Sequence, residues 1–266
     1  MGVRSEIKRG LLVIDSAALT DVGRRRQINE DRYRLDPDAR VFILADGMGG
    51  HAAGSIAAET AVATIHGFLQ LFELAAARLS WPFGYDADLP FEHNALRTAF
   101  RMANERIIEM AMEKGCWGMG TTAVATWIRN GTVHYAHVGD NRLYLLRSNR
   151  LELLTRDHTL VAEQVRRGLI TIEQARMHPL RRLVTRAIGS REPFSADVSS
   201  LPLLDGDYLL LCSDGLTDQV SSDEMREILG KEGDLETKCR QLVTAANESG
   251  GNDDVTVIVL RNRGGR

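Results

Sequence analysis

Acidic residues stand at the ends of short apolar segments in five places along the 266-residue chain. These are Asp46 after 42–45, Asp140 after 135–138, Asp214 after 209–212, Asp253 with Asp254 before 255–260, and Glu30 with Asp31 before Arg32. A single case has an ordinary explanation, because aspartate is a common turn residue and Asp-Gly a common turn dipeptide. Five such cases in one chain favour a functional explanation. If the segment ends meet at one edge of a packed sheet, four or five carboxylates converge on one cleft.

A cluster of carboxylates needs positive charge, because like charges a few ångströms apart do not all stay ionised without compensation. A bound cation supplies that charge, and carboxylates without a Cys or His cluster suit Mg²⁺ or Mn²⁺. Two such metals that share a bridging carboxylate hold and deprotonate a water near neutral pH. Arg26, close to Glu30 and Asp31, is the candidate for binding an anionic substrate, since guanidinium pairs with phosphate through two parallel hydrogen bonds.

Short apolar or β-branched segments bounded by Gly, Asp or Asn predict the strands that must position these acids. The segments are 41–45, 121–128, 133–138, 142–146, 208–212 and 255–260. Asn130-Gly131, between two of them, is typical of a hairpin turn. A second tight connection is expected at 139–141, with antiparallel pairing of the strands on either side, because a parallel crossover needs a dozen or more residues.

Apolar residues at helical spacing predict three helices, over 52–74, over 94–112 and through 235–246. The segment 80–90, with two prolines and a glycine, is interpreted as a surface loop, and 157–182 as a small appended subregion with short helices. Neither an internal repeat nor a Ser-, Gly- or Pro-rich linker divides the chain. These elements favour an α+β fold of antiparallel sheets flanked by helices, in a single domain over 11–262.

Composition argues against several classes of protein. With 44% hydrophobic and 26% charged residues, the chain is unlike disordered, collagen-like or coiled-coil proteins. Three widely spaced cysteines argue against a disulfide scaffold or a zinc site, and 33 basic against 36 acidic residues argue against nucleic-acid binding. The apolar run at 11–14 is too short for the core of a signal peptide or for a membrane span. We therefore expect a cytoplasmic monomer with neither a membrane nor a nucleic acid as partner.

The motifs that carry these acids resemble those of the metal-dependent protein phosphatases called PP2C or PPM. They follow the family order and span nearly the whole chain: Thr20-Asp-Val-Gly-x-x-Arg26-x-x-Asn29-Glu30-Asp31, Ala45-Asp-Gly-Met-Gly-Gly-His51, Met119-Gly-Thr-Thr122, Val138-Gly-Asp-Asn-Arg-Leu-Tyr144, Ser213-Asp-Gly-Leu216 and Asp253-Asp-Val-Thr256. Each of these motifs alone is weak evidence for the family, whereas six of them in the family order are specific. The residues from 46 to 51 match the bacterial branch of the family.

The resemblance implies two Mn²⁺ or Mg²⁺ ions per active site. Asp46 would bridge the two metals, and Gly47 would offer its backbone carbonyl to one of them. Asp214 and Asp253 would complete the protein ligands of the second metal. Asp140 matches the position that, in bacterial members, helps Asp214 to hold a third and weaker metal.

The resemblance also implies that Glu30 and Asp31 hold metal-bound water in the outer shell and that Arg26 binds the substrate phosphate. The implied fold is an antiparallel β-sandwich flanked by α-helices, in which 156–182 resembles the family's mobile flap beside the cleft. The implied activity is hydrolysis of phosphoserine and phosphothreonine monoesters on phosphoproteins, by attack of a water held between the two metals. By analogy, the enzyme opposes a bacterial Ser/Thr kinase.

Three positions depart from the family pattern. Met48 stands where many eukaryotic members carry a His that is proposed as the general acid, so that role falls to a metal-bound water or to another group. Asp254 replaces the usual Asn and either tightens metal binding or faces solvent. Asn141 replaces a Ser, without a consequence that the sequence reveals.

The other candidate functional residues are interpreted as structural. None of the seven histidines stands at metal-ligand spacing from another, and His51 and His158 are interpreted as structural residues. Ser213 lacks a base partner, which disfavours a serine nucleophile. Two rival functions are a catalytically silent phosphoprotein-binding module and a two-metal nuclease or phosphodiesterase. The complete set of acids argues against the first, and the lack of a basic stripe argues against the second.

Overall fold

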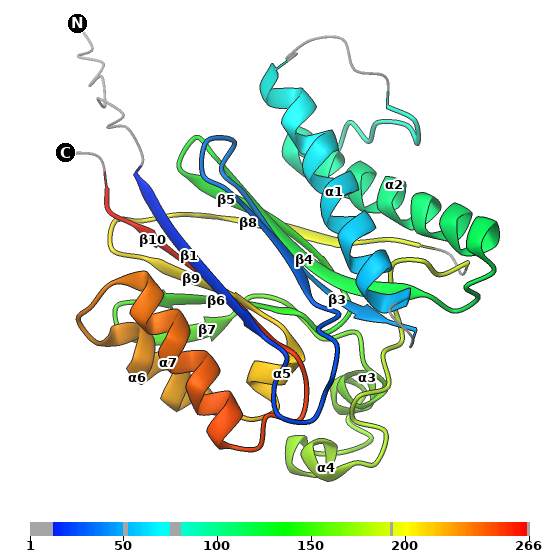
Figure 1. Cartoon of the computed structure of the whole chain (residues 1–266). Coiled ribbons are helices and arrows are strands. Elements are labelled where there is room, and N and C mark those ends of the chain that lie inside the picture. Colours follow the sequence, from blue (N-terminus) through cyan, green and yellow to red (C-terminus); the bar gives the residue numbers. More distant parts are fainter. Residues whose placement is uncertain (1–12, 50–52, 75–80, 192–193, 265–266) are drawn as a thin grey trace, which may run out of the picture.

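Two five-stranded antiparallel sheets pack face to face and carry helices on their outer sides (Figure 1). The computed structural model describes residues 13–49, 53–74, 81–191 and 194–264. The first sheet has the order β1 (Ile14–Asp21), β10 (Val255–Asn262), β9 (Tyr208–Cys212), β6 (Arg142–Arg147) and β7 (Arg150–Leu153). The second has the order β2 (Arg32–Asp36), β3 (Val41–Met48), β4 (Gly120–Arg129), β5 (Thr132–Val138) and β8 (Asp197–Pro202).

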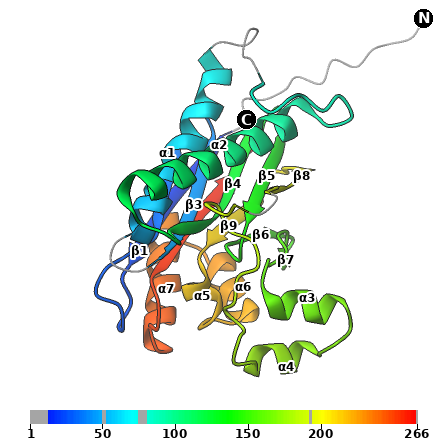
Figure 2. The same ribbon diagram turned by 90° about the vertical axis from the view of Figure 1, so that its right-hand side faces the viewer.

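Helices cover the outer face of each sheet (Figures 1 and 2). The long helices α1 (Ala53–Leu74) and α2 (Phe91–Lys114) pack on the second sheet, whereas α6 (Ser222–Gly230) and α7 (Leu235–Glu248) pack on the first. The predicted β-sandwich flanked by α-helices is therefore confirmed. Among the described residues, no helix combines the length and the apolar character that crossing a membrane requires.

The six predicted strands are confirmed as β3, β4, β5, β6, β9 and β10, and their continuous apolar runs have a structural reason. Each lies inside a sheet that is covered on both faces. In β3, Phe42 and Leu44 belong to the apolar layer between the sheets, while Ile43 and Ala45 belong to the layer under α1 and α2. Strands buried on both sides are apolar at every position rather than at alternate positions.

One predicted connection between strands is confirmed, and the strand pairing predicted for another is wrong. Asn130 and Gly131 both have positive φ, 50° and 76°, as a type I′ hairpin turn between β4 and β5 requires. The predicted antiparallel pairing of β5 with β6 is wrong, because β5 lies in the second sheet and β6 in the first. Gly139, at φ 100°, lies where the chain crosses between the sheets, and a Cβ there would lie 2.2 Å from Thr122 Cγ2.

The subregion that resembles the flap consists of two short helices, α3 (Leu160–Arg166) and α4 (Ile172–Met177). Both begin at a threonine whose hydroxyl accepts a backbone N–H bond of the first turn, Thr159 from Ala162 and Thr171 from Gln174. In both views they lie at the end of the sandwich where α5 (Asp214–Thr217) begins (Figures 1 and 2).

Candidate metal-dependent active site

The acidic residues of both sheets converge at one end of the sandwich. Asp46 lies near the end of β3 in the second sheet, whereas Asp214 follows β9 and Asp253 precedes β10 in the first. Strands β9 and β10 are hydrogen-bonded neighbours, which brings their two acids close together. Burial and then the charges of Asp31, Asp214, Asp140 and Asp253 raise the pKa of Asp46 well above its usual range. The convergence inferred from the sequence is therefore present in the structure.

This acidic centre holds more negative charge than its own hydrogen bonds compensate. Burial raises the pKa of Asp31 to about 7, and burial followed by the charge of Asp157 raises that of Asp140 to about 6. Four carboxylate oxygens are buried with no hydrogen-bond partner among the described residues: Glu30 Oε1, Asp31 Oδ1, Asp214 Oδ1 and Asp254 Oδ1. Buried polar atoms are rarely left unpaired, and oxygens alone are the ligands that Mg²⁺ and Mn²⁺ prefer. The donor set thus fits these divalent metals.

Close packing explains the glycine next to Asp46. A Cβ on Gly47 would lie 2.1 Å from the Gly54 carbonyl oxygen and 2.9 Å from that of Glu30, both backbone atoms. The backbone carbonyl of Asp46 accepts a hydrogen bond of 2.7 Å from the Thr121 hydroxyl on β4. The end of β3 is therefore fixed between α1, β4 and the 29–31 segment, with no space for a side chain at position 47.

Buried hydrogen bonds position Asp31. Ser213 is fully buried, and its hydroxyl donates to Asp31 Oδ2 at 2.9 Å while accepting from the Thr256 backbone N–H at 3.0 Å. This arrangement makes Ser213 a positioning residue and leaves its hydroxyl no access to substrate. Asp254 is also buried, and its Oδ2 accepts the Glu30 backbone N–H at 2.8 Å. Asp254 therefore does not face solvent, but holds the segment that carries Glu30 and Asp31.

Two arginines from distant parts of the sequence bind Asp253. Arg26 Nε lies 2.7 Å from Oδ1 and Arg26 Nη2 lies 3.0 Å from Oδ2. Arg182, at the end of the flap, donates from Nη1 to the same Oδ2 at 3.1 Å and also pairs with Asp218. The sequence singled out Arg26, as the residue that binds the substrate phosphate, but predicted neither its pairing with Asp253 nor any role for Arg182. Arg182 lies among four arginines between 176 and 186, and no spacing distinguishes it from the others.

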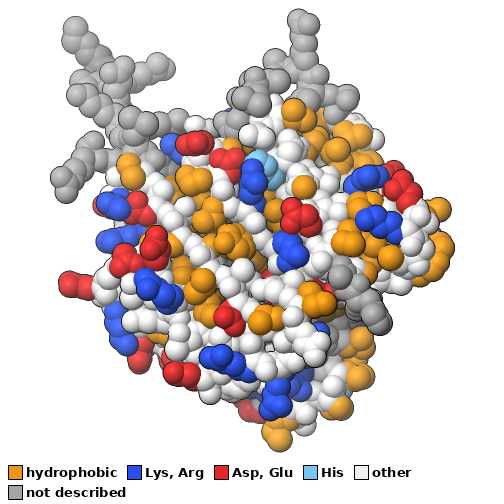
Figure 3. Space-filling view, viewed as in Figure 1, with side chains coloured by type: hydrophobic (Ala, Val, Ile, Leu, Met, Phe, Trp, Pro, Cys, Tyr) orange, Lys and Arg blue, Asp and Glu red, His pale blue; other side chains and the backbone are white. Residues whose placement is uncertain are grey.

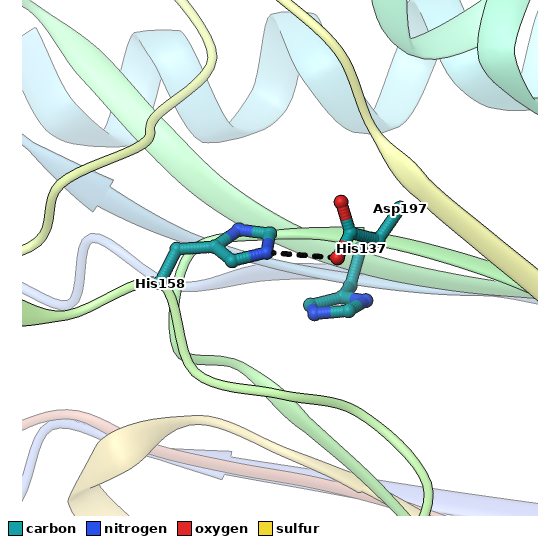
Figure 4. Close-up of side chains that lie close together, drawn as sticks. All are labelled: His137, His158 and Asp197. Atoms are coloured by element: carbon teal, nitrogen blue, oxygen red, sulfur yellow. Dashed lines mark hydrogen bonds and ion pairs between the residues drawn. The ribbon is translucent and has the colours of Figure 1, made fainter. Parts of the chain in front are cut away.

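A histidine cluster lies at the base of the flap (Figure 4). The rings of His137 and His158 stack with centroids 4.7 Å apart, and His158 Nε2 is 3.3 Å from Asp197 Oδ2. These three side chains could hold a metal ion by spacing alone. The guanidinium of Arg186 already supplies a positive charge there, with Nη1 at 2.8 Å from both His158 Nε2 and Asp197 Oδ1.

The role of His158 is accordingly structural. Its Nδ1 accepts the Gly139 backbone N–H at 3.0 Å, and its own backbone N–H donates to the Gly139 carbonyl at 2.9 Å. Burial, His137 and Arg186 lower the pKa of His158 to about 4, so the ring is neutral at neutral pH. The structural interpretation of His158 is therefore supported, while His51 lies outside the described residues. The sequence did not reveal the pairing with His137, because the two residues are brought together only by the fold.

Comparison with known proteins assigns a family to this centre. The sequence model described as protein phosphatase 2C matches residues 23–255, so the chain belongs to this family. It is a metal-dependent phosphatase that acts on phosphorylated serine and threonine residues of proteins, with Mn²⁺ or Mg²⁺ as cofactor. This assignment decides against a nuclease or phosphodiesterase.

Its relatives include bacterial serine/threonine phosphatases. The serine/threonine phosphatase stp of Listeria welshimeri is 38% identical over 248 residues, which cover 91% of this chain and 93% of that protein. The phosphatase PstP/Ppp of Mycobacterium tuberculosis has a solved structure with a TM-score of 0.81 at 35% identity, covering 94% of this chain and 99% of that one. A further structure, the catalytic domain of a PstP in complex with two manganese ions, has a TM-score of 0.79 at 34% identity, with coverages of 94% and 99%.

Proposed function

We propose that the acidic centre is the catalytic site and that Asp46, Asp214, Asp253 and the Gly47 carbonyl hold two divalent metals there. The observation that carries this proposal is the set of buried, unpartnered carboxylate oxygens at the meeting point of both sheets. When bound, the metals supply Lewis acidity that activates water and offsets the charge of the phosphoryl group. Asp140, beside Asp214, is proposed as a ligand of a third and weaker metal.

The remaining side chains orient water and substrate. Glu30 and Asp31 are proposed to accept hydrogen bonds from metal-bound water, in positions fixed by Asp254 and Ser213. Arg26 is proposed to bind the phosphoryl oxygens, because it is half exposed at the edge of the centre and its fork already engages an anionic carboxylate. As negative charge grows on those oxygens, Arg26 stabilises it.

The proposed substrates are phosphoproteins that a bacterial Ser/Thr kinase has modified, so the enzyme would oppose that kinase. Names such as serine/threonine phosphatase stp among the relatives support this role. We also propose that residues 11–262 form a single phosphatase domain and that the protein is a cytoplasmic monomer. Acidic and basic side chains are interspersed on the face shown in Figure 3, in keeping with protein rather than nucleic-acid substrates.

Replacing Asp46 or Asp214 by Asn tests the site. Each change keeps the size of the side chain and removes a charged ligand, so we expect Mn²⁺-dependent hydrolysis of a phosphothreonine peptide to fall below detection, at least about a thousandfold. Asp223→Asn is the control, because the Asp223 side chain on α6 is 92% exposed. Circular dichroism must show that all variants fold. Near-native rates for Asp46→Asn or Asp214→Asn would mean that the metal assignment is wrong.

A further inference from the structure

Arg182 is held at two points, only one of which belongs to the proposed metal site. Its Nε and Nη2 donate to Asp218 Oδ2 at 2.8 and 2.7 Å. Its third nitrogen, Nη1, donates to Asp253 Oδ2 at 3.1 Å. Asp218 therefore grips one edge of the guanidinium, while the other edge points at the acidic centre.

A metal on Asp253 would change this arrangement in a defined way. A carboxylate oxygen that coordinates a metal keeps a second lone pair, but the metal withdraws negative charge from it and makes it a weaker acceptor for guanidinium donors. The bond from Arg182 to Asp253 would then weaken, whereas both bonds to Asp218 would stay. The result is a guanidinium that Asp218 still orients, with one N–H group directed at the site and only weakly engaged by Asp253.

We propose that Arg182 is a second phosphate-binding residue, carried into the site by the flap and oriented by Asp218. Arg26 approaches from the 22–31 loop and Arg182 from the flap, so a phosphoryl group at the centre would meet a guanidinium from each. Guanidinium groups form strong charge-assisted bonds with phosphate, and an oriented one loses less entropy on binding. Because the flap carries Arg182, phosphate binding would also fix the flap over the bound residue. This inference rests on the proposed assignment of Asp253 as a metal ligand.

The variant Arg182→Gln tests the proposal, with Arg176→Gln as its matched control. Arg176 is exposed on α4 of the same flap, so its removal takes away the same charge without touching the centre. The first measurement is the rise in Tm that inorganic phosphate produces in the Mn²⁺-loaded protein, which reports phosphate affinity without turnover. The second is the separation of KM from kcat on a phosphothreonine peptide.

We expect Arg182→Gln to weaken phosphate binding at least about tenfold, the usual effect of losing a charge-assisted hydrogen bond, and to raise KM by a similar factor. The kcat should change by less than about threefold, since binding to ground state and transition state is lost together. Asp218→Asn should act in the same direction but less, because it frees the guanidinium rather than removing it. Arg176→Gln should behave like the unmodified protein.

One result would overturn the proposal directly. If Arg182→Gln bound Mn²⁺ more tightly but bound phosphate as before, Arg182 would be only a counter-ion that competes with the metal for Asp253. The failure of the underlying site assignment looks different. In that case Asp253→Asn would keep its Mn²⁺-dependent activity, whatever Arg182→Gln does.

Discussion

Among the described residues outside the acidic centre, two bidentate Arg–Asp pairs have nearly the same geometry, but only one of them lies at the base of the flap, so comparing them separates the effect on stability from the effect on activity. Arg142 Nε and Nη2 donate to Asp157 at 2.9 and 2.7 Å, directly after Asp140 and Asn141. Arg147 Nε and Nη2 donate to Asp207 at 2.8 and 2.6 Å, at the other end of β6. Asp157 precedes His158, which is bonded to Gly139 on both its ring and its backbone. Only the first pair therefore ties the flap to the Asp140 loop.

The cost of Asp157→Asn follows from burial. Removing one partner of a buried ion pair costs about 3–5 kcal/mol, and exposure of the arginine lowers that figure because water then solvates the charge. The Asp157 side chain is 16% exposed and that of Arg142 28%. We therefore expect a loss of about 2–3 kcal/mol, or a Tm lower by roughly 4–12 °C. Asp207→Asn should cost at least as much, because the Asp207 side chain is 2% exposed and also accepts the Leu204 backbone N–H.

The two variants should differ in activity. With both assayed well below their Tm and in excess Mn²⁺, Asp157→Asn should lower kcat/KM on a phosphothreonine peptide about tenfold, which corresponds to about 1.4 kcal/mol of misplaced flap and Asp140 loop. Asp207→Asn should keep kcat/KM within about twofold. Urea unfolding measures the free energy of unfolding of both variants. If the two variants lost stability equally and activity equally, the pair at the base of the flap would have no role beyond folding.

Two further predictions concern the acidic centre. Gly47→Ala should abolish Mn²⁺ binding in calorimetry and lower the Tm, because the new Cβ would lie 2.1 Å from a backbone oxygen. Gly67→Ala on α1 is the control: its Cβ would have no atom within 4 Å, and the change should raise the free energy of unfolding by about 0.5–1 kcal/mol. The rise in Tm that Mn²⁺ produces should be larger at pH 8 than at pH 5. The pKa of Asp31 is raised to about 7 and that of Asp140 to about 6, so both carboxyls hold protons at pH 5. Metal binding must displace these protons, which weakens it at the lower pH. A Tm rise that is independent of pH would contradict the raised pKa values of Asp31 and Asp140.

The strands that the sequence did not predict are the four edge strands. β1 and β7 flank the first sheet, and β2 and β8 flank the second. Edge strands are covered less completely, so they tolerate polar residues and lose the apolar pattern by which strands are identified. In β7 and β8 exposed positions predominate, whereas β3, β4 and β9 are buried almost throughout.

The sequence also predicted which acids converge, but not what holds them. Strand-end positions are local and can be inferred from neighbouring residues, as for Asp46, Asp214 and Asp253. The bond from Ser213 to Asp31 joins residues 182 positions apart, and that from Arg182 to Asp253 joins residues 71 apart. The first pair depends on how the two sheets are stacked and the second on how the flap lies against the first sheet, and no local pattern specifies either arrangement. The wrong pairing of β5 with β6 has the same origin, since a short link also serves to change sheets.

The position of the acids between the two sheets gives the cofactor a structural consequence. Asp46 lies on β3 of the second sheet, whereas Asp214 follows β9 and Asp253 precedes β10 of the first, so the proposed ligands come from both halves of the sandwich. Without metal, their charges repel one another across the contact between the sheets, and of these three acids the ion pairs of Arg26 and Arg182 engage Asp253. With metal, the same carboxylates would join the halves. Binding that occurs only in the folded state stabilises it, so an enzyme built this way should be most stable when it is ready to act.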